Sequence, residues 1–166
     1  MSLFLVRGGV KLSYRKELTS ESAIVRMPPP KRVLIPLQQH VGSPAEPVVQ
    51  VGDRVGKGQL IGKPGRGISA AVHASTSGTV VAIEERTAPH PSGLTQLTVV
   101  IESDGEDRWA ELPRPVTGVF PLPTTPKDIS ERVAAAGVVG LGGAAFPSAV
   151  KLDMRQRHEL DTLVIN

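Results

Sequence analysis

Short apolar runs separated by glycine and proline constrain the fold of this chain more than any other feature. From Pro47 to Ile83, pairs such as Val48-Val49 and Val80-Val81 alternate with glycine-containing turns. The 166 residues include 17 Gly and 15 Pro, whereas aromatic residues make up only 3% of the chain. Because such runs are too short for helices, they predict many short strands joined by tight turns, around a core of Val, Ile, Leu and Ala.

The composition also excludes several classes of function. The chain has no cysteine, so it holds no disulfide, thiol nucleophile or iron–sulfur ligand of its own. The scarcity of aromatic residues argues against stacking on the bases of single-stranded nucleic acid, and we expect no nucleic-acid partner. There is no apolar run of about 18 residues and no signal-peptide pattern at the start, so we expect a soluble, cytoplasmic chain.

The sequence divides into four predicted segments. Residues 1–32 form an extended basic arm with a clear excess of Lys and Arg over Glu, ending in three consecutive prolines. Residues 33–103 form a β-domain, and residues 104–126 form a proline-rich linker. Residues 127–166 are the start of an α/β unit that is incomplete in this chain.

Local patterns predict individual elements within these segments. Val33-Leu34-Ile35 is a short strand, and residues 96–102 form a strand with Leu97, Val99 and Ile101 on one face. Thr125 is expected to cap a helix that has Pro126 at its first position and ends at Gly137. A second helix is expected over 148–157 and a last strand over 162–166.

Two glycine-rich half-motifs of the β-domain resemble the lipoyl and biotinyl domains. They cover residues 51–61 and 72–80, with turns at Gly52-Asp53 and Gly58-Gln59. The resemblance implies a flattened barrel of two interlocking halves, a barrel-sandwich hybrid. In those carriers a modified lysine occupies the tip of the hairpin between the halves. Here the tip is Pro64-Gly65-Arg66-Gly67, and Lys63 precedes it, so a biotinyl- or lipoyl-type carrier is only an alternative function.

The histidines of the chain do not form a recognisable catalytic or metal-binding pattern. His73 stands beside Ser75 and Thr76, but no orienting group and no oxyanion donors accompany it. We expect a turn histidine that is hydrogen-bonded to the backbone. His40, His90 and His158 lack the spacing of metal ligands, so neither a metal site nor a catalytic residue is assigned.

A glycine-rich loop at residues 137–151 is the most informative stretch. Gly140, Gly142 and Gly143 would allow backbone N–H groups to approach a planar or phosphorylated ligand closely. Their spacing is not that of the dinucleotide fingerprint. Lys151 could neutralise a phosphate or a reduced flavin. The alternatives are a hinge or a close helix contact for the loop, and an exposed helix lysine for Lys151.

The loop is similar to the glycine-rich loop in the flavin- and NADH-binding subunit of respiratory complex I. It resembles still more closely the loop in the C subunits of the Rnf/Rsx ion-translocating electron transport complexes. Further blocks along the chain share this resemblance, in the same order: Gly8-Gly9-Val10, Ile35-Pro36-Leu37, Gln39-His40-Val41-Gly42, Pro44-Ala45-Glu46-Pro47, His73-Ala74-Ser75-Thr76-Ser77-Gly78 and Pro89-His90-Pro91-Ser92-Gly93-Leu94.

The resemblance implies a flavin site at this loop. FMN would contact Gly140, Gly142 and Gly143, and NADH would stack on the flavin and deliver a hydride. By the same resemblance, Phe146 would lie beside the nicotinamide and Lys151 would serve the flavin or nucleotide. Asn166 would meet the flavin at the end of the last strand. Leu141 replaces an arginine that is usual in the complex I relatives, so other groups would have to compensate charge there.

The implied function is that of the electron-entry subunit in a membrane-bound ion-translocating NADH:ferredoxin oxidoreductase. Two 4Fe–4S clusters of the family belong to a C-terminal part that this chain lacks. The implied partners are the membrane subunits of the complex and ferredoxin or a similar electron carrier. Through those partners the protein would sit peripherally on the cytoplasmic side of the bacterial inner membrane. The alternative is a docking module without catalytic activity, which binds membrane subunits through the basic arm and β-domain.

Overall fold

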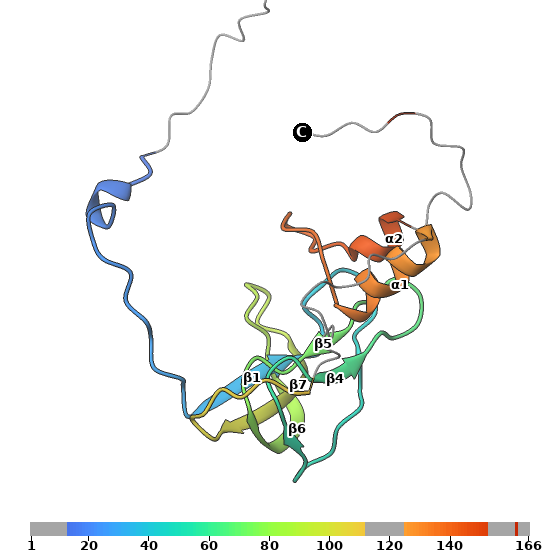
Figure 1. The fold of residues 1–166 in the computed structure, drawn as a ribbon, viewed down its shortest axis with the longest axis horizontal. Coiled ribbons are helices and arrows are strands. Elements are labelled where there is room, and N and C mark those ends of the chain that lie inside the picture. The colour runs from blue at the N-terminus through green and yellow to red at the C-terminus, as the bar shows by residue number, and fades with distance from the viewer. Residues whose placement is uncertain (1–12, 112–124, 153–161, 163–166) are drawn as a thin grey trace, which may run out of the picture.

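The structure, a computed structural model, describes residues 13–111, 125–152 and 162. Most of the described chain is a β-domain, and a small helical unit with the glycine loop lies beside it (Figure 1). Residues 163–166 of the predicted last strand, Asn166 among them, residues 153–157 of the predicted second helix and residues 112–124 of the predicted linker lie outside the described residues. The elements in order are η1 (Lys16–Leu18), β1 (Arg32–Pro36), β2 (Glu46–Pro47), β3 (Arg54–Val55), β4 (Leu60–Lys63), β5 (Val72–His73), β6 (Gly78–Thr87), β7 (Thr95–Ser103), α1 (Pro126–Ala135) and α2 (Ser148–Leu152).

Two antiparallel sheets make up the β-domain. One has four strands in the order β1-β7-β6-β3, and the other has three strands in the order β2-β4-β5. In the larger sheet Val33 lies opposite Ile101, and the long β6–β7 hairpin pairs Thr79 with Glu102 at one end and Thr87 with Thr95 at the other. The strands predicted over 33–35 and 96–102 are confirmed as parts of β1 and β7.

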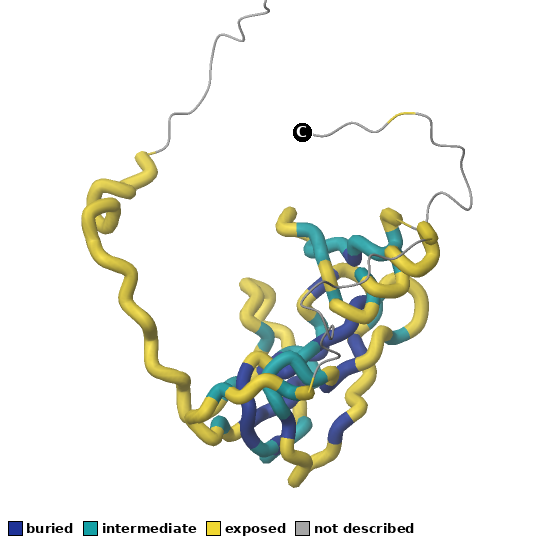
Figure 2. The backbone as a smooth tube through the Cα atoms, in the orientation of Figure 1, coloured by how far each residue is buried: buried dark blue, intermediate teal, exposed yellow. Residues whose placement is uncertain are grey.

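The apolar core lies where the two sheets face one another. Leu37, Ile61, Val80, Val99 and Ile101 have no exposed surface. Ile61 comes from the three-stranded sheet, the last three come from the four-stranded sheet, and Leu37 directly follows β1. Leu97, Val99 and Ile101 all pack on this core, as the alternation along the strand predicted. Figure 2 shows that the buried residues gather in the β-domain, whereas the described part of the arm, residues 13–31, is exposed along its whole length.

Glycines with positive φ form the predicted turns between the short strands. Gly52 has a φ of 99° and Gly58 a φ of 78°, a backbone region that residues with a Cβ rarely adopt. Gln50 N–H donates to Oδ2 of Asp53 at 2.8 Å, which closes the first of these turns. The turn residues therefore end the strands at the positions that the sequence indicated.

The helical unit begins with the predicted cap. Asp128 N–H donates to Oγ1 of Thr125 at 3.1 Å, and Thr125 N–H donates to Oδ2 of Asp128 at 3.2 Å. This reciprocal capping box satisfies N–H groups that the first helical turn leaves unpaired. Helix α1 ends at Ala135, and Gly137 follows with a φ of 65°. Helix α2 is described as far as Leu152 and packs against α1.

The first part of the predicted linker packs on the β-domain. Lys57 N–H donates to the carbonyl oxygen of Arg108 at 2.8 Å, and Ala110 N–H donates to the carbonyl oxygen of Lys57 at 2.9 Å. The chain between Asp104 and Ala110 therefore runs beside the turn that follows β3.

A matched pair of isoleucine substitutions tests the position of the core. We expect Ile101→Ala to lower the free energy of unfolding by about 2–5 kcal/mol, because it leaves a cavity at a fully buried site. Ile24→Ala, at a side chain that is 100% exposed, should change it by less than about 0.5 kcal/mol. Urea unfolding of both variants measures the difference, and equal midpoints would contradict this description of the core.

Candidate functional site

Three of the six predicted site residues come together at the base of the glycine loop. Gly140 N–H donates to the carbonyl oxygen of Phe146 at 2.8 Å. The Lys151 Nζ lies 5.6 Å from the centroid of the Phe146 ring, within reach of a cation–π contact. A Cβ added to Gly140 would lie 3.9 Å from the same Nζ, so the ammonium group stands beside the loop backbone.

The loop is closed on itself like a small hairpin. Val139 and Pro147 form an antiparallel bridge, and Ser148 N–H donates to the carbonyl oxygen of Val138 at 2.9 Å. At the tip, Ala145 N–H donates to the carbonyl oxygen of Gly142 at 2.9 Å, and Ala145 has a φ of 42°. These bonds hold the two ends of the loop together and expose its tip.

The tip presents backbone to open space. A Cβ built on Gly142 or Gly143 would have no heavy atom within 4 Å. Among the described residues, the N–H groups of Gly142, Gly143 and Ala144 donate to no acceptor. Unpaired N–H groups without side chains can approach a flat or anionic ligand closely. Gly142 and Gly143 therefore lie at the open end of the loop, whereas Gly140, Phe146 and Lys151 lie at its base.

The helical unit contacts the β-domain beside a cavity of about 240 Å³. Val41 N–H donates to the carbonyl oxygen of Ala144 at 3.0 Å, which joins the β-domain to the glycine loop. The lining residues come from both units and are Gln39, His40, Ala70, Ala71, Val72, His73, Gly137 and Val139. Sequence reasoning missed His40, which is only 7% exposed and lies at this junction. The one signal in the sequence that could have pointed to His40 is its place in Gln39-His40-Val41-Gly42, a block that resembles the family.

His73 lies in strand β5 rather than in the expected turn. Its ring lines the junction cavity, and the expected hydrogen bond to the backbone is not formed with any described residue. The difference arises because the strand pairs His73 with Leu60 of β4, which directs the side chain out of the turn region.

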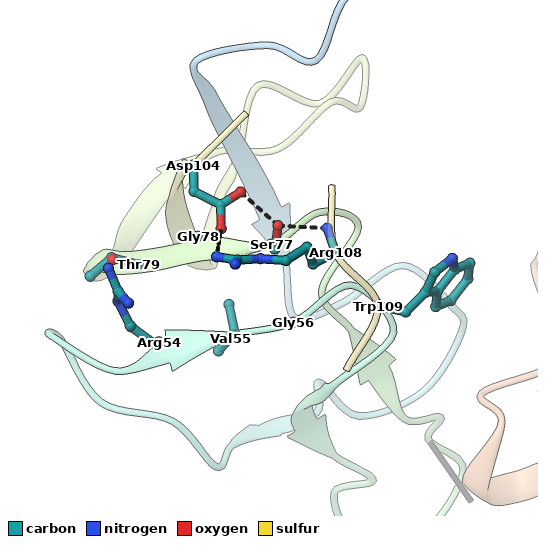
Figure 3. A pocket seen from close by; sticks show the side chains of 9 residues that line it. All are labelled: Arg54, Val55, Gly56, Ser77, Gly78, Thr79, Asp104, Arg108 and Trp109. Carbon is teal, nitrogen blue, oxygen red and sulfur yellow. Dashed lines mark hydrogen bonds and ion pairs between the residues drawn. The ribbon is translucent and has the colours of Figure 1, made fainter. Parts of the chain in front are cut away.

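A second cavity of about 270 Å³ is lined by residues of β3, β6 and the chain that follows β7 (Figure 3). The Ser77 Oγ donates to Oδ1 of Asp104 at 2.7 Å and accepts from Arg108 N–H at 2.8 Å. Arg108 Nη2 in turn donates to Oδ2 of Asp104 at 3.3 Å. The serine hydroxyl, the Glu106 N–H and the Arg108 guanidinium together lower the pKa of Asp104. Among the described residues that line this cavity there is no imidazole to activate Ser77. Its hydroxyl instead joins the Asp104 carboxylate to the backbone of Arg108 and so holds the chain after β7.

Lys57 makes a second set of contacts with the chain that follows β7. Its Nζ lies 2.5 Å from Oδ2 of Asp107 and 5.0 Å from the centroid of the Trp109 ring. The hydrogen bond from this ammonium group lowers the pKa of Asp107. In Figure 3 the Trp109 side chain points away from the cluster of Ser77, Asp104 and Arg108.

The hairpin that would carry a modified lysine does not present one. Lys63 lies on strand β4 opposite Glu46, and their side chains form an ion pair at 3.1 Å. The connection of residues 64–71 contains no lysine. It folds back instead, with the Ser69 Oγ donating to the carbonyl oxygen of Ser43 at 2.9 Å. The geometry therefore gives no support to a carrier function.

The described ranges contain neither a metal centre nor a membrane span of the helical kind. Within residues 13–111 and 125–152, no three side chains of the types that ligate metals gather into a site. No helix in these ranges has the length and apolar character needed to cross a membrane.

The β-domain with its paired sheets is a barrel-sandwich hybrid, the fold class expected from the half-motifs. A family model described as the RnfC barrel sandwich hybrid domain matches residues 4–106, and the chain belongs to this family. Over 164 residues it is 50% identical to the C subunit of the ion-translocating oxidoreductase complex of Rhodobacter capsulatus, covering 98% of this chain and 31% of that protein.

Other relatives show the same relation. The protein of the same name from Pseudomonas aeruginosa is 46% identical, with 96% of this chain and 20% of that protein covered. The C subunit of the Na(+)-translocating ferredoxin:NAD(+) oxidoreductase complex of Acetobacterium woodii is 42% identical, with 96% and 35% covered. The chain thus spans about a third or less of the curated relatives that it matches.

The lowered pKa of Asp104 predicts a loss of stability in acid. A depressed pKa stabilises the folded chain above the ordinary aspartate value of about 3.9, and this contribution is lost as the pH falls through the folded value. Asp104→Asn should therefore be less stable than the unsubstituted chain at neutral pH and should lose less stability below about pH 4. Thermal unfolding across pH 2–7 measures both effects.

Glu85→Gln is the matched control, because Glu85 is exposed on β6 and its carboxylate forms no hydrogen bond or ion pair with another described residue. It should follow the unsubstituted chain at every pH. Identical pH profiles for Asp104→Asn and Glu85→Gln would show that the Ser77–Asp104–Arg108 cluster does not contribute.

Proposed function

We propose that this chain is the N-terminal portion of the electron-entry subunit of a membrane-bound, ion-translocating NADH:ferredoxin oxidoreductase, and that its glycine loop binds FMN. One observation carries the proposal: the loop stands on the β-domain with free N–H groups at Gly142 and Gly143 and with Lys151 at its base. The names of the Rhodobacter and Acetobacterium relatives support the oxidoreductase role. Residues 127–166 would be the start of the flavin domain.

The residues present fit FMN chemically. Space is open where a Cβ would stand on Gly142 and Gly143, so a planar ring or a phosphate could reach the backbone N–H groups directly. The ammonium group of Lys151 would balance negative charge on the phosphate or on the reduced ring. It would also supply the positive charge that an arginine usually provides at the position of Leu141 in the complex I relatives. Leu141 itself is fully exposed at the tip.

When bound, FMN would supply the ability to accept a hydride from NADH and to release electrons singly. The loop N–H groups would bind and orient its anionic part. The half-buried Phe146 would offer an apolar face beside the nicotinamide and exclude water there. Asn166, which is not among the described residues, would make a further contact with the flavin.

The electrons would leave through two 4Fe–4S clusters held by other parts of the full-length subunit, because this chain has no cysteine. Ferredoxin or a similar carrier would exchange electrons with the complex. The subunit would lie peripherally on the cytoplasmic side of the bacterial inner membrane and would be retained there by membrane subunits.

Flavin titration with two variants tests the site. Lys151→Met should weaken FMN binding about tenfold, because it removes a charge-assisted contact. Gly142→Val should also weaken binding while leaving stability nearly unchanged, since its side chain would meet only open space in the folded chain. Quenching of flavin fluorescence on titration with protein gives the Kd values.

Lys127→Met is the control, since Lys127 is exposed on α1 and, among the described residues, its ammonium group pairs with Glu131 alone, at 3.6 Å. It should bind FMN as the unsubstituted chain does. The site would be wrong if the unsubstituted chain left flavin fluorescence unquenched, or if all three variants bound equally well.

A docking role is a second candidate that is compatible with the first. The described arm exposes Ile24, Val25 and Met27 by 100%, 85% and 79%, next to the basic residues Arg26 and Lys31. Such an exposed apolar segment with positive charge would bind a partner surface that is apolar and is surrounded by acidic residues.

Replacement of both Ile24 and Val25 by Ser should reduce binding of the chain to vesicles that contain the membrane subunits. Binding of the unsubstituted chain to the same vesicles should weaken as the salt concentration rises. Co-sedimentation measures both effects. Undiminished binding of the double variant at low salt would remove the arm from the interface.

A further inference from the structure

We propose that His40 is a positioning residue that fixes the glycine loop on the β-domain. The loop of residues 38–43 and the connection of residues 64–71 would together form a dock for the glycine loop, with His40 at its centre. The role in ligand binding rests on the proposed function, whereas the dock itself can be tested without a flavin.

Both ring nitrogens of His40 are engaged inside the β-domain. The Nε2 accepts from Ala70 N–H at 3.1 Å, and the Nδ1 lies 3.2 Å from the carbonyl oxygen of Val41. Because an amide N–H can only donate, Nε2 must carry a lone pair. The proton of the neutral ring is then on Nδ1, which donates to Val41. The ring thus bridges the connection 64–71 and the backbone of residue 41.

Other contacts fasten the same two segments together. Ser43 N–H donates to the carbonyl oxygen of Ile68 at 2.8 Å, and the Ser69 Oγ donates to the carbonyl oxygen of Ser43 at 2.9 Å. Within the loop of residues 38–43, the side-chain amide of Gln38 donates to the carbonyl oxygen of Gly42 at 2.8 Å. Gly42 has a φ of 101°, and a Cβ there would lie 2.1 Å from the carbonyl oxygen of Ile68. No side chain fits at that point, so the two backbones approach as closely as they can.

The dock holds the helical unit at two points. Val41 N–H donates to the carbonyl oxygen of Ala144 at the tip of the glycine loop, at 3.0 Å. At the other end, a Cβ on Gly137 would lie 2.4 Å from the carbonyl oxygen of Ala71 and 3.4 Å from Cε1 of His73. Of the backbone hydrogen bonds among the described residues, the Val41–Ala144 bond alone joins the two units.

These contacts explain what the connection 64–71 does in a domain whose hairpin tip presents no lysine. In the lipoyl-type carriers that the β-domain resembles, the corresponding tip is free to present its lysine. Here the tip is held against residues 38–43. The two hydrogen bonds of the His40 ring fix the backbone of Val41 relative to the connection 64–71. A loop that is already fixed loses less conformational entropy when a ligand binds, so the dock should raise flavin affinity.

Amide hydrogen exchange at Val41, measured by NMR on the whole chain, tests the dock directly. His40→Phe keeps a ring but removes both hydrogen bonds, and Val41 N–H should then exchange about 5- to 30-fold faster. His40→Gln keeps an acceptor for Ala70 N–H and should restore part of the protection. The amides of Val99 and Ile101, in the core of the sheet, should exchange as before.

His90→Gln is the matched control, because His90 is exposed in the turn between β6 and β7 and its ring bonds only to Ser92 among the described residues. It should leave Val41 exchange unchanged. In parallel, the Kd for FMN should rise in His40→Phe by about the same factor as the exchange rate of Val41 N–H. In His40→Gln the Kd should lie between the values for His40→Phe and the unsubstituted chain.

The dock would be refuted if Val41 exchange in His40→Phe equalled that of the unsubstituted chain, or if Val41 and Ile101 exchange accelerated equally. The positioning role would be refuted if Val41 exchange accelerated without any change in FMN affinity. If the unsubstituted chain bound no FMN, the proposed function would fail, and Val41 exchange would still decide whether the dock exists.

Discussion

The apolar contact between the two sheets is the interaction on which the rest of the structure depends. Strands β2, β3 and β5 have only two residues each, and so short a strand has no stability of its own. Strands β3 and β5 are held because Val55 and Val72 share one core with Val80, Val99 and Ile101, whereas β2 is held by its pairing with β4. Burial of this core is the main favourable contribution that offsets the entropy of ordering so many turns.

The same packing leaves the carrier-like fold without a lysine at its hairpin tip. Lys63 is held on a strand by Glu46, so no amine projects from the hairpin tip. The tip is used instead to build the surface that meets the glycine loop, through His40 and Val41. The β-domain thus provides rigidity, and in the proposed function any redox chemistry depends on the loop and on a bound flavin.

Features that depend on neighbouring residues could be predicted from the sequence. The cap at Thr125, the strand with alternating Leu97, Val99 and Ile101, and the turns at Gly52 and Gly58 all follow from patterns a few residues long. These predictions succeed because one turn or one strand period fixes each geometry.

Features that depend on distant contacts could not be predicted in this way. The acceptor role of His40 requires Ala70, which lies 30 residues away, and the fastening of Asp104 requires Ser77, 27 residues away. The expected backbone bond of His73 failed for the same reason, since pairing of β4 with β5 decides where its ring points. No period in the sequence encodes which of four histidines becomes buried at the junction.

The central claim, that this chain carries the base of a flavin site for electrons from NADH, is tested most directly by absorption spectroscopy. The measurement uses the full-length protein that contains this chain, purified with its clusters assembled. We predict a flavin absorbance that bleaches on addition of NADH, together with NADH-driven reduction of an electron acceptor. A full-length protein that shows neither flavin absorbance nor NADH-driven reduction would contradict the claim.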